Sequence, residues 1–107
     1  MSKFVRNIIV ELDFEGDKAV FTLSPMTYAT ALRFRESARN VTEETKAEAE
    51  KILLSELAAS TQFVRGITDA AGVEVEKEVL FNAAYFAPLV ADLALEWMRQ
   101  STPSGNG

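Results

Sequence analysis

The sequence contains neither cysteine nor histidine among its 107 residues. Without cysteine, the chain has no disulfide, no thiolate nucleophile and no thiolate metal site. Without histidine, it lacks the commonest metal ligand and the commonest general base near neutral pH. The two absences argue against an enzyme and against a bound metal or cofactor, although carboxylate and lysine chemistry stay open.

Long apolar runs are also absent, because no stretch approaches the roughly 20 apolar residues that a membrane span needs. Charges recur in residues 1–20, at Lys3, Arg6, Glu11 and Asp13, so the apolar centre of a signal peptide is missing. We therefore expect a cytoplasmic protein without membrane contact. Its length suits one domain with one modest core.

Basic residues are fewer than acidic ones, and the formal net charge is −5. Nucleic-acid binders usually carry a basic footprint, so we expect no nucleic-acid partner. Two local clusters of charge have surface interpretations.

The acids Glu74, Glu76 and Glu78 alternate along the chain, so they do not converge on one metal ion, whether the segment is a strand or a helix. Glu36 lies among the basic residues Arg33, Arg35 and Arg39, which favours surface ion pairs over phosphate binding.

The first 24 residues predict a β-hairpin. Even-numbered positions of residues 3–14 are apolar apart from Arg6, so we expect a strand whose even-numbered side chains are buried. Glu15-Gly16-Asp17 is a turn signal, and residues 18–24 read as the second strand after a loop of about three to five residues. Because an isolated hairpin is marginal in water, it must pack on helices.

Helical patterns follow. Ser24 and Pro25 predict the N-cap and first residue of a helix over 25–39. Thr42 opens a second helix that ends near Ala59, although Thr45 stands where a capping box has Glu or Gln. Its expected core stripe is Ala49, Ile52, Leu53 and Leu57. Residues 63–67 read as a short extended segment, against which residues 73–75 pair back.

The stretch from residue 64 to 98 holds the densest apolar spacing. After a turn region, apolar residues recur at spacings of three and four from Val79 to Met98. They predict a helical run from about residue 76 to 100, kinked or restarted at Pro88. We expect residues 101–107 to be disordered. The predicted fold is one α+β domain over residues 1–100, mainly α, with the hairpin packed on four to five helices.

These last helices hold more large apolar side chains than one core stripe needs. At helical spacing such residues are usually core, but a half-exposed Tyr or Trp is a typical anchor for a protein partner. Which of them are core and which are exposed stays open. We expect the exposed ones to bind a partner and to support homo-oligomers when no partner is present. The candidates are Phe81, Tyr85, Phe86, Leu89, Trp97 and Met98.

The order of these segments carries a resemblance. A hairpin and two helices precede the signature V-x-G-[IW]-x-D-x-x-G-x-x-[VI], formed by Val64, Gly66, Ile67, Asp69, Gly72 and Val75. Closing helices then run from Val79-Leu80-Phe81 through Leu93, Glu96 and Trp97 to Ser101. The chain is similar in this to the small tail assembly chaperones of long-tailed bacteriophages and prophages.

The resemblance implies a protein of the host bacterial cytoplasm that is absent from the mature virion. It implies binding to helical segments of the tape measure protein, which stays soluble until tail-tube subunits polymerise around it. It also implies self-association, leaves contact with the tail tube protein open, and brings no catalytic residue. The alternative is a small acidic inhibitor or regulator that mimics nucleic acid, suggested by the net charge of −5.

Overall fold

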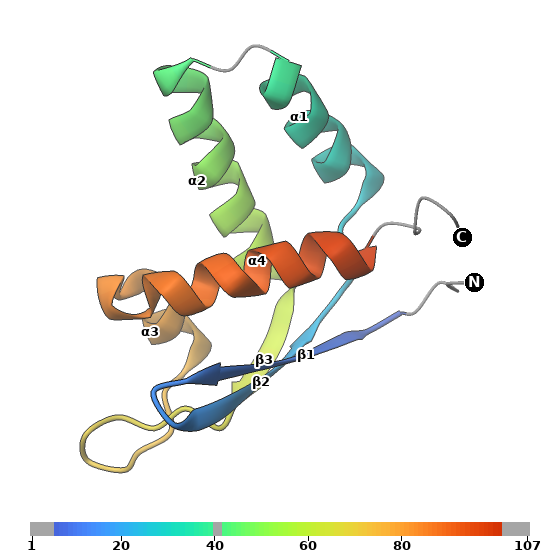
Figure 1. Cartoon of the computed structure of the whole chain (residues 1–107). Coiled ribbons are helices and arrows are strands. Elements are labelled where there is room, and N and C mark those ends of the chain that lie inside the picture. Colours follow the sequence, from blue (N-terminus) through green and yellow to red (C-terminus); the bar gives the residue numbers. More distant parts are fainter. Residues whose placement is uncertain (1–5, 40–41, 102–107) are drawn as a thin grey trace.

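The computed structural model describes residues 6–39 and 42–101. It confirms an α+β domain, in which a three-stranded antiparallel sheet packs with four α-helices (Figure 1). The elements in chain order are β1 (Ile8–Phe14), β2 (Asp17–Leu23), α1 (Tyr28–Arg39), α2 (Glu43–Ser60), β3 (Thr61–Arg65), α3 (Lys77–Asn82), the 3-10 helix η1 (Ala84–Phe86) and α4 (Ala87–Ser101).

The predicted hairpin is confirmed, with a tighter turn. Phe14 pairs with Asp17, so Glu15 and Gly16 alone form the loop, shorter than the predicted three to five residues. Both have positive φ, 49° and 86°, which is the conformation of a type I′ hairpin turn. The even-numbered face of β1 is the inner one, as predicted: Ile8 and Val10 are buried, and Leu12 and Phe14 are partly buried. Residues 3–5 lie outside the described part of the chain.

The extended segment predicted over 63–67 is a third strand of the sheet. It begins earlier, at Thr61, because α2 runs directly into it. β3 pairs antiparallel with β2, in the order β1-β2-β3. The predicted return pairing is also present: Thr68 forms a bridge with Glu74, and the Val75 amide donates to the Ile67 carbonyl over 2.8 Å.

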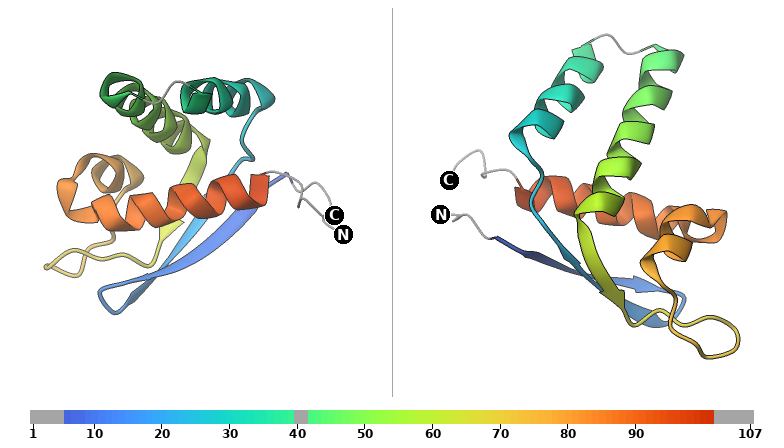
Figure 2. Two further views of the ribbon diagram at one scale, coloured as in Figure 1. Left: turned by 45° about the horizontal axis from the view of Figure 1, so that its top comes forward. Right: turned by 180° about the vertical axis from the view of Figure 1, so that it is seen from behind.

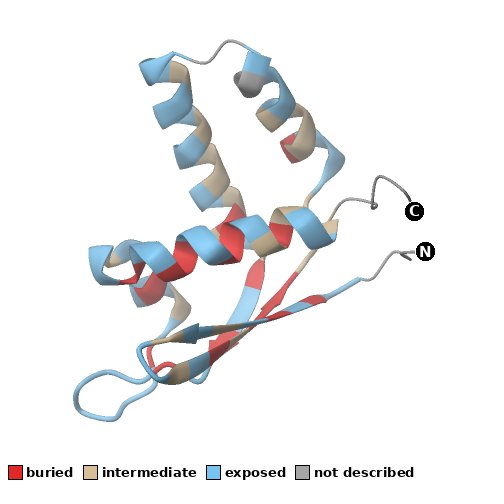
Figure 3. Cartoon of the chain, viewed as in Figure 1, coloured by how far each residue is buried: buried red, intermediate tan, exposed pale blue. Residues whose placement is uncertain are grey.

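The core lies between one face of the sheet and α4, which crosses that face (Figures 1 and 3). Leu93 is fully buried there, and Trp97 is 1% exposed. The indole N–H of Trp97 donates to the Ser24 carbonyl over 2.9 Å, which satisfies its polar atom inside the core. The buried sheet residues are Ile8, Val10, Ala19, Phe21, Leu23 and Val64.

Helix α1 begins at Tyr28, three residues later than predicted. The cap is Thr27, whose hydroxyl accepts from the Thr30 amide over 3.2 Å, and not Ser24. Ser24 is instead held by the rest of the fold, because its amide donates to the Ser60 carbonyl over 2.8 Å. Tertiary partners have therefore overridden a local start signal.

Helix α2 begins at the predicted cap. Thr42 and Thr45 bond each other's amides in a capping box, so a threonine fills the role of Glu or Gln. Of the predicted core stripe only Leu57 is buried; Ala49, Ile52 and Leu53 are partly exposed. The reason is visible in Figure 1: α1 and the first half of α2 stand away from the sheet.

The C-terminal run is divided at Ala83 rather than at Pro88. α3 ends at Asn82, and α4 begins at Ala87 with Pro88 in its first turn, where a missing N–H is tolerated. Ser101, predicted to be disordered, belongs to α4, and its hydroxyl accepts from the Met26 amide over 2.9 Å. Residues 102–107 lie outside the described part. None of the helices described combines the length and the apolar character that crossing a bilayer requires.

Candidate partner-binding groove

A groove of about 630 Å³ runs between α2, α3 and α4. Apolar side chains dominate its lining. Its lining combines five alanines with larger apolar residues. The alanines are Ala83, Ala84, Ala87, Ala91 and Ala94, and the larger residues include Leu53, Leu54, Phe81, Leu95 and Met98.

The groove exists because α4 is apolar on two sides. The side facing the sheet carries Leu89, Leu93 and Trp97, which fill the core. The side that lines the groove carries Ala87, Ala91 and Ala94 beside larger apolar residues, and the short alanine side chains leave space between the helices. The lining of α4 extends from Ala87 to Met98, which at 1.5 Å per residue is about 16 Å, or three helical turns.

Large aliphatic side chains at the groove are open to solvent. Leu54 on α2 is 44% exposed and Leu95 on α4 is 62% exposed. Both line the groove, together with the charged residue Glu50. Contiguous apolar surface with a polar rim is typical of a protein interaction site.

The predicted site residues are distributed over three places. Phe81 and Met98 line the groove and are partly buried. Phe86, Leu89 and Trp97 are buried in the core, with exposed fractions of 7%, 1% and 1%, so they hold the sheet and α4 together and present no free surface.

Tyr85, the sixth predicted residue, lies outside the groove lining and is 61% exposed. Its ring contacts Phe14 and Phe86 edge to face, at centroid distances of 5.7 and 5.2 Å. Its hydroxyl donates to the Glu15 carboxylate in the hairpin turn. Tyr85 therefore covers the outside of an aromatic cluster between η1 and the hairpin.

Most of the groove lining was not among the predicted site residues, including the exposed residues Leu54, Ala91 and Leu95. The signal was present, because α4 has apolar residues on more of its circumference than the core stripe occupies. Leu54 likewise lies beside the predicted stripe of α2 rather than on it. Such surplus apolar positions form a second face that the described part of the chain does not cover.

Charged groups at the exposed end of α4 pair with one another. The Glu96 carboxylate accepts from Arg99, with Arg99 Nη2 to Glu96 Oε2 at 2.7 Å, and from Gln100 over 3.1 Å. The hydrogen bond from Arg99, and then that from Gln100, lowers the pKa of Glu96. Arg33, a predicted partner of Glu36, instead reaches Glu56 on α2 at 3.5 Å.

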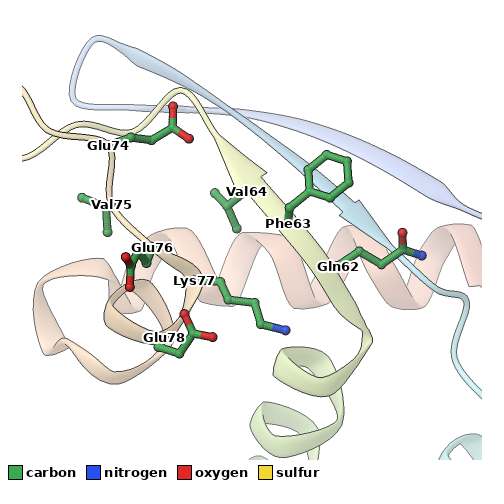
Figure 4. Close-up of a pocket in the computed structure, with 8 residues that line it drawn as sticks. All are labelled: Gln62, Phe63, Val64, Glu74, Val75, Glu76, Lys77 and Glu78. Atoms are coloured by element: carbon green, nitrogen blue, oxygen red, sulfur yellow. The ribbon is translucent and has the colours of Figure 1, made fainter.

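A second depression, of about 450 Å³, lies beside β3 and includes the acids Glu74, Glu76 and Glu78 (Figure 4). Lys77 also lines this depression, but its ammonium donates to the carbonyl of Thr61, the residue directly after α2, over 2.7 Å. The carboxylates in Figure 4 point in different directions. Across residues 6–39 and 42–101, no three acidic side chains are grouped to hold a metal ion.

The signature residues build the loop between β3 and α3. Asp69 Oδ1 accepts from the Ala71 and Val73 amides, each over 2.9 Å, which is an Asx turn. Gly66 and Gly72 have φ of 93° and 81°, which favours glycine. Asp69, Gly66 and Gly72 thus each have a structural role within this loop.

The chain matches no protein-family model, no curated protein and no solved structure.

Proposed function

We propose that this protein is a tail assembly chaperone of a long-tailed phage or prophage, and that the groove between α2, α3 and α4 holds a helical segment of the tape measure protein. It acts in the bacterial cytoplasm, keeps its client soluble during assembly of the tail tube, and is absent from the mature virion. The observation that carries the proposal is an apolar groove, about three turns long, that residues 6–39 and 42–101 leave open. The order of elements and the loop signature supply the choice of family.

The groove has the chemistry that helix-in-groove recognition uses. An amphipathic helix presents anchors at i, i+3 or i+4, and i+7, which span about 10 Å and fit within the roughly 16 Å of lining along α4. The alanines of the lining allow close approach of a client helix, while Leu54 and Leu95 lose exposed apolar surface on contact. Met98 adds an adaptable side chain, suited to holding several related segments.

Glu50 indicates which sign of charge the client helix should carry beside its apolar stripe. It is the charged residue in the lining, on the α2 wall. We expect the bound helix to carry a lysine or arginine beside its apolar stripe, since opposite charge at a rim fixes orientation and accelerates association. Such a stripe would be an aggregation hazard in the unassembled tape measure protein, which is what a chaperone covers.

The test uses overlapping peptides that cover the tape measure protein encoded with this chain, with affinity measured by fluorescence anisotropy. Ala91→Leu adds volume to the groove lining at an exposed position, and we expect it to weaken binding by at least about tenfold without loss of stability. The matched control is Ala59→Leu, an exposed alanine on the opposite side of α2. Leu95→Glu, with Val79→Glu as its control, repeats the comparison with a charge.

The proposal is abandoned if no tape measure segment binds, or if Ala91→Leu and Leu95→Glu bind as tightly as the wild type. Neighbouring genes give an independent test: a tail tube gene before this one and a very long coiled-coil gene after it would support the family.

The acidic inhibitor is the second candidate, and it is favoured by the acids Glu15 and Asp17 at the hairpin turn and Asp69 and Glu74 in the loop after β3. The hairpin turn and the loop after β3 meet, since the Thr68 amide lies 3.5 Å from Asp17 Oδ2. Such an inhibitor would bind a basic nucleic-acid-binding protein. That affinity would fall steeply with salt and would be indifferent to Ala91→Leu.

A further inference from the structure

The face of the sheet turned away from α4, the outer face, is organised in cross-strand rows. The first row is apolar at both ends: Ile9 on β1 pairs with Thr22 on β2, which pairs with Phe63 on β3. The second row has opposite charges at its ends: Glu11 on β1, Val20 on β2 and Arg65 on β3. The first row thus forms an apolar centre of the outer face, and the second row forms a rim with a negative charge at one edge and a positive charge at the other.

The apolar row is uncovered within the described chain. Ile9 is 55% exposed and Phe63 is 45% exposed, while Thr22 is only 7% exposed because these two flank it. The Arg65 guanidinium lies over the Phe63 ring, 5.2 Å from its centroid. Viewed from behind, the strands lie in front of α4, so the helix covers only the other face (Figure 2). A layer with its large side chains exposed in this way is expected to be buried by a partner.

The distribution of charge selects the partner. Glu11 and Arg65 stand at opposite edges of the same row and have opposite sign, so the face is complementary to its own copy turned over about the central strand. Such self-complementarity defines an isologous two-fold interface. A two-fold axis across the strands would instead stack β1 on β1 and bring Glu11 toward its own copy.

We propose that the outer face docks a second copy of this chain, sheet on sheet, about a two-fold axis along β2. This axis exchanges β1 and β3, so Glu11 faces Arg65 of the partner subunit and Ile9 packs on the partner's Phe63. The strands of the two sheets are then nearly aligned, as in sandwich packing. Lys18 lies near the axis, but its ammonium is 3.9 Å from Glu11 of its own chain, so opposite charge already screens it.

The area of the outer face sets the expected stability of the dimer. Seven residues of β1 span about 24 Å and three strands about 14 Å, which gives roughly 340 Å² for each copy. This is less than half of the roughly 800 Å² that each partner contributes to a standard interface. We therefore expect a dimer that forms at high micromolar concentration and dissociates at low micromolar concentration. It does not depend on the proposed function, because the groove lies on the other side of α4.

The experiment is charge reversal followed by sedimentation equilibrium from about 5 to 500 µM. Glu11→Arg alone, or Arg65→Glu alone, places like charges opposite each other at both ends of row two. We expect each to weaken the dimer by at least about tenfold. Mixing the two variants restores both attractive pairs, so a heterodimer should form. Glu48→Arg, an exposed reversal on α2, is the matched control and should leave the dimer unchanged.

The apolar centre gives a second readout. Phe63→Thr keeps a strand-forming residue on the edge strand and should also weaken the dimer, with little change in the thermal unfolding of the monomer. The proposal is overturned if the wild type stays monomeric at 500 µM, or if it dimerises equally well in both single-reversal variants. It is also overturned if the mixture forms no heterodimer, which would assign the face to a different occupant.

Discussion

Gly66 is where the chain leaves β3, and replacing it with alanine should disrupt the sheet. Its φ is 93°, and an added Cβ would collide with the carbonyl oxygen of Lys18 on β2 and lie 3.1 Å from the carbonyl carbon. Positive φ costs a non-glycine residue about 1–2 kcal/mol. The collision is with backbone, so β2 and β3 must separate locally, at about 1–3 kcal/mol by analogy with overpacking. We expect Gly66→Ala to lower the free energy of unfolding by about 2–5 kcal/mol.

Gly72 supplies the control for backbone strain. It has a similar φ of 81°, but nothing lies within 4 Å of an added Cβ. Gly72→Ala should therefore lose only the roughly 1–2 kcal/mol of strain. Urea denaturation followed by circular dichroism measures both variants, and the difference between them isolates the close approach to Lys18. If Gly66→Ala is no more destabilised than Gly72→Ala, β3 is not docked on β2 as described.

Two further predictions concern the core and the pH dependence. Leu93→Ala should cost about 2–5 kcal/mol, because Leu93 is fully buried; Leu53→Ala, at the partly exposed groove wall, should cost less, and equal losses in urea denaturation would contradict the assigned core. The depressed pKa of Glu96 means that its pairing with Arg99 stabilises the fold above the ordinary value of 4.5 and is lost as pH falls through the lower folded value. The stability difference between wild type and Glu96→Gln should therefore shrink from pH 6 to pH 3, and a constant difference would show that the pairing does not contribute.

Local patterns were sufficient where local physics decides the structure. Period-two alternation identified the hairpin and its buried face, and Thr42 marked the start of α2. They failed where a distant partner decides. Ser24 has the chemistry of an N-cap, yet Trp97 takes its carbonyl, 73 residues away in sequence. The strand from Thr61 needed β2 as its partner, which a five-residue segment alone does not reveal.

The candidate site was predictable in kind but not in position. A surplus of large apolar residues suggested an apolar binding face on the C-terminal helices, but two of the candidates, Trp97 and Leu89, are buried in the core. The groove is defined instead by small residues, since Ala87 and Ala91 leave space that leucine would fill. Small side chains on one side of a helix indicate a groove only when the positions of the neighbouring helices are known.

The groove lies among the helices and the outer face lies on the sheet, and the two share no residue. α4 directs Leu93 toward the sheet and Ala91 toward the groove, while the sheet directs Phe21 inward and Phe63 outward. Docking through the outer face would therefore leave the groove of each copy open. Two grooves on one particle suit a long client that repeats its apolar stripe, because the second contact becomes intramolecular and gains effective concentration. A weak dimer is compatible with this arrangement, since a client that bridges two copies raises their local concentration and stabilises the dimer by linkage.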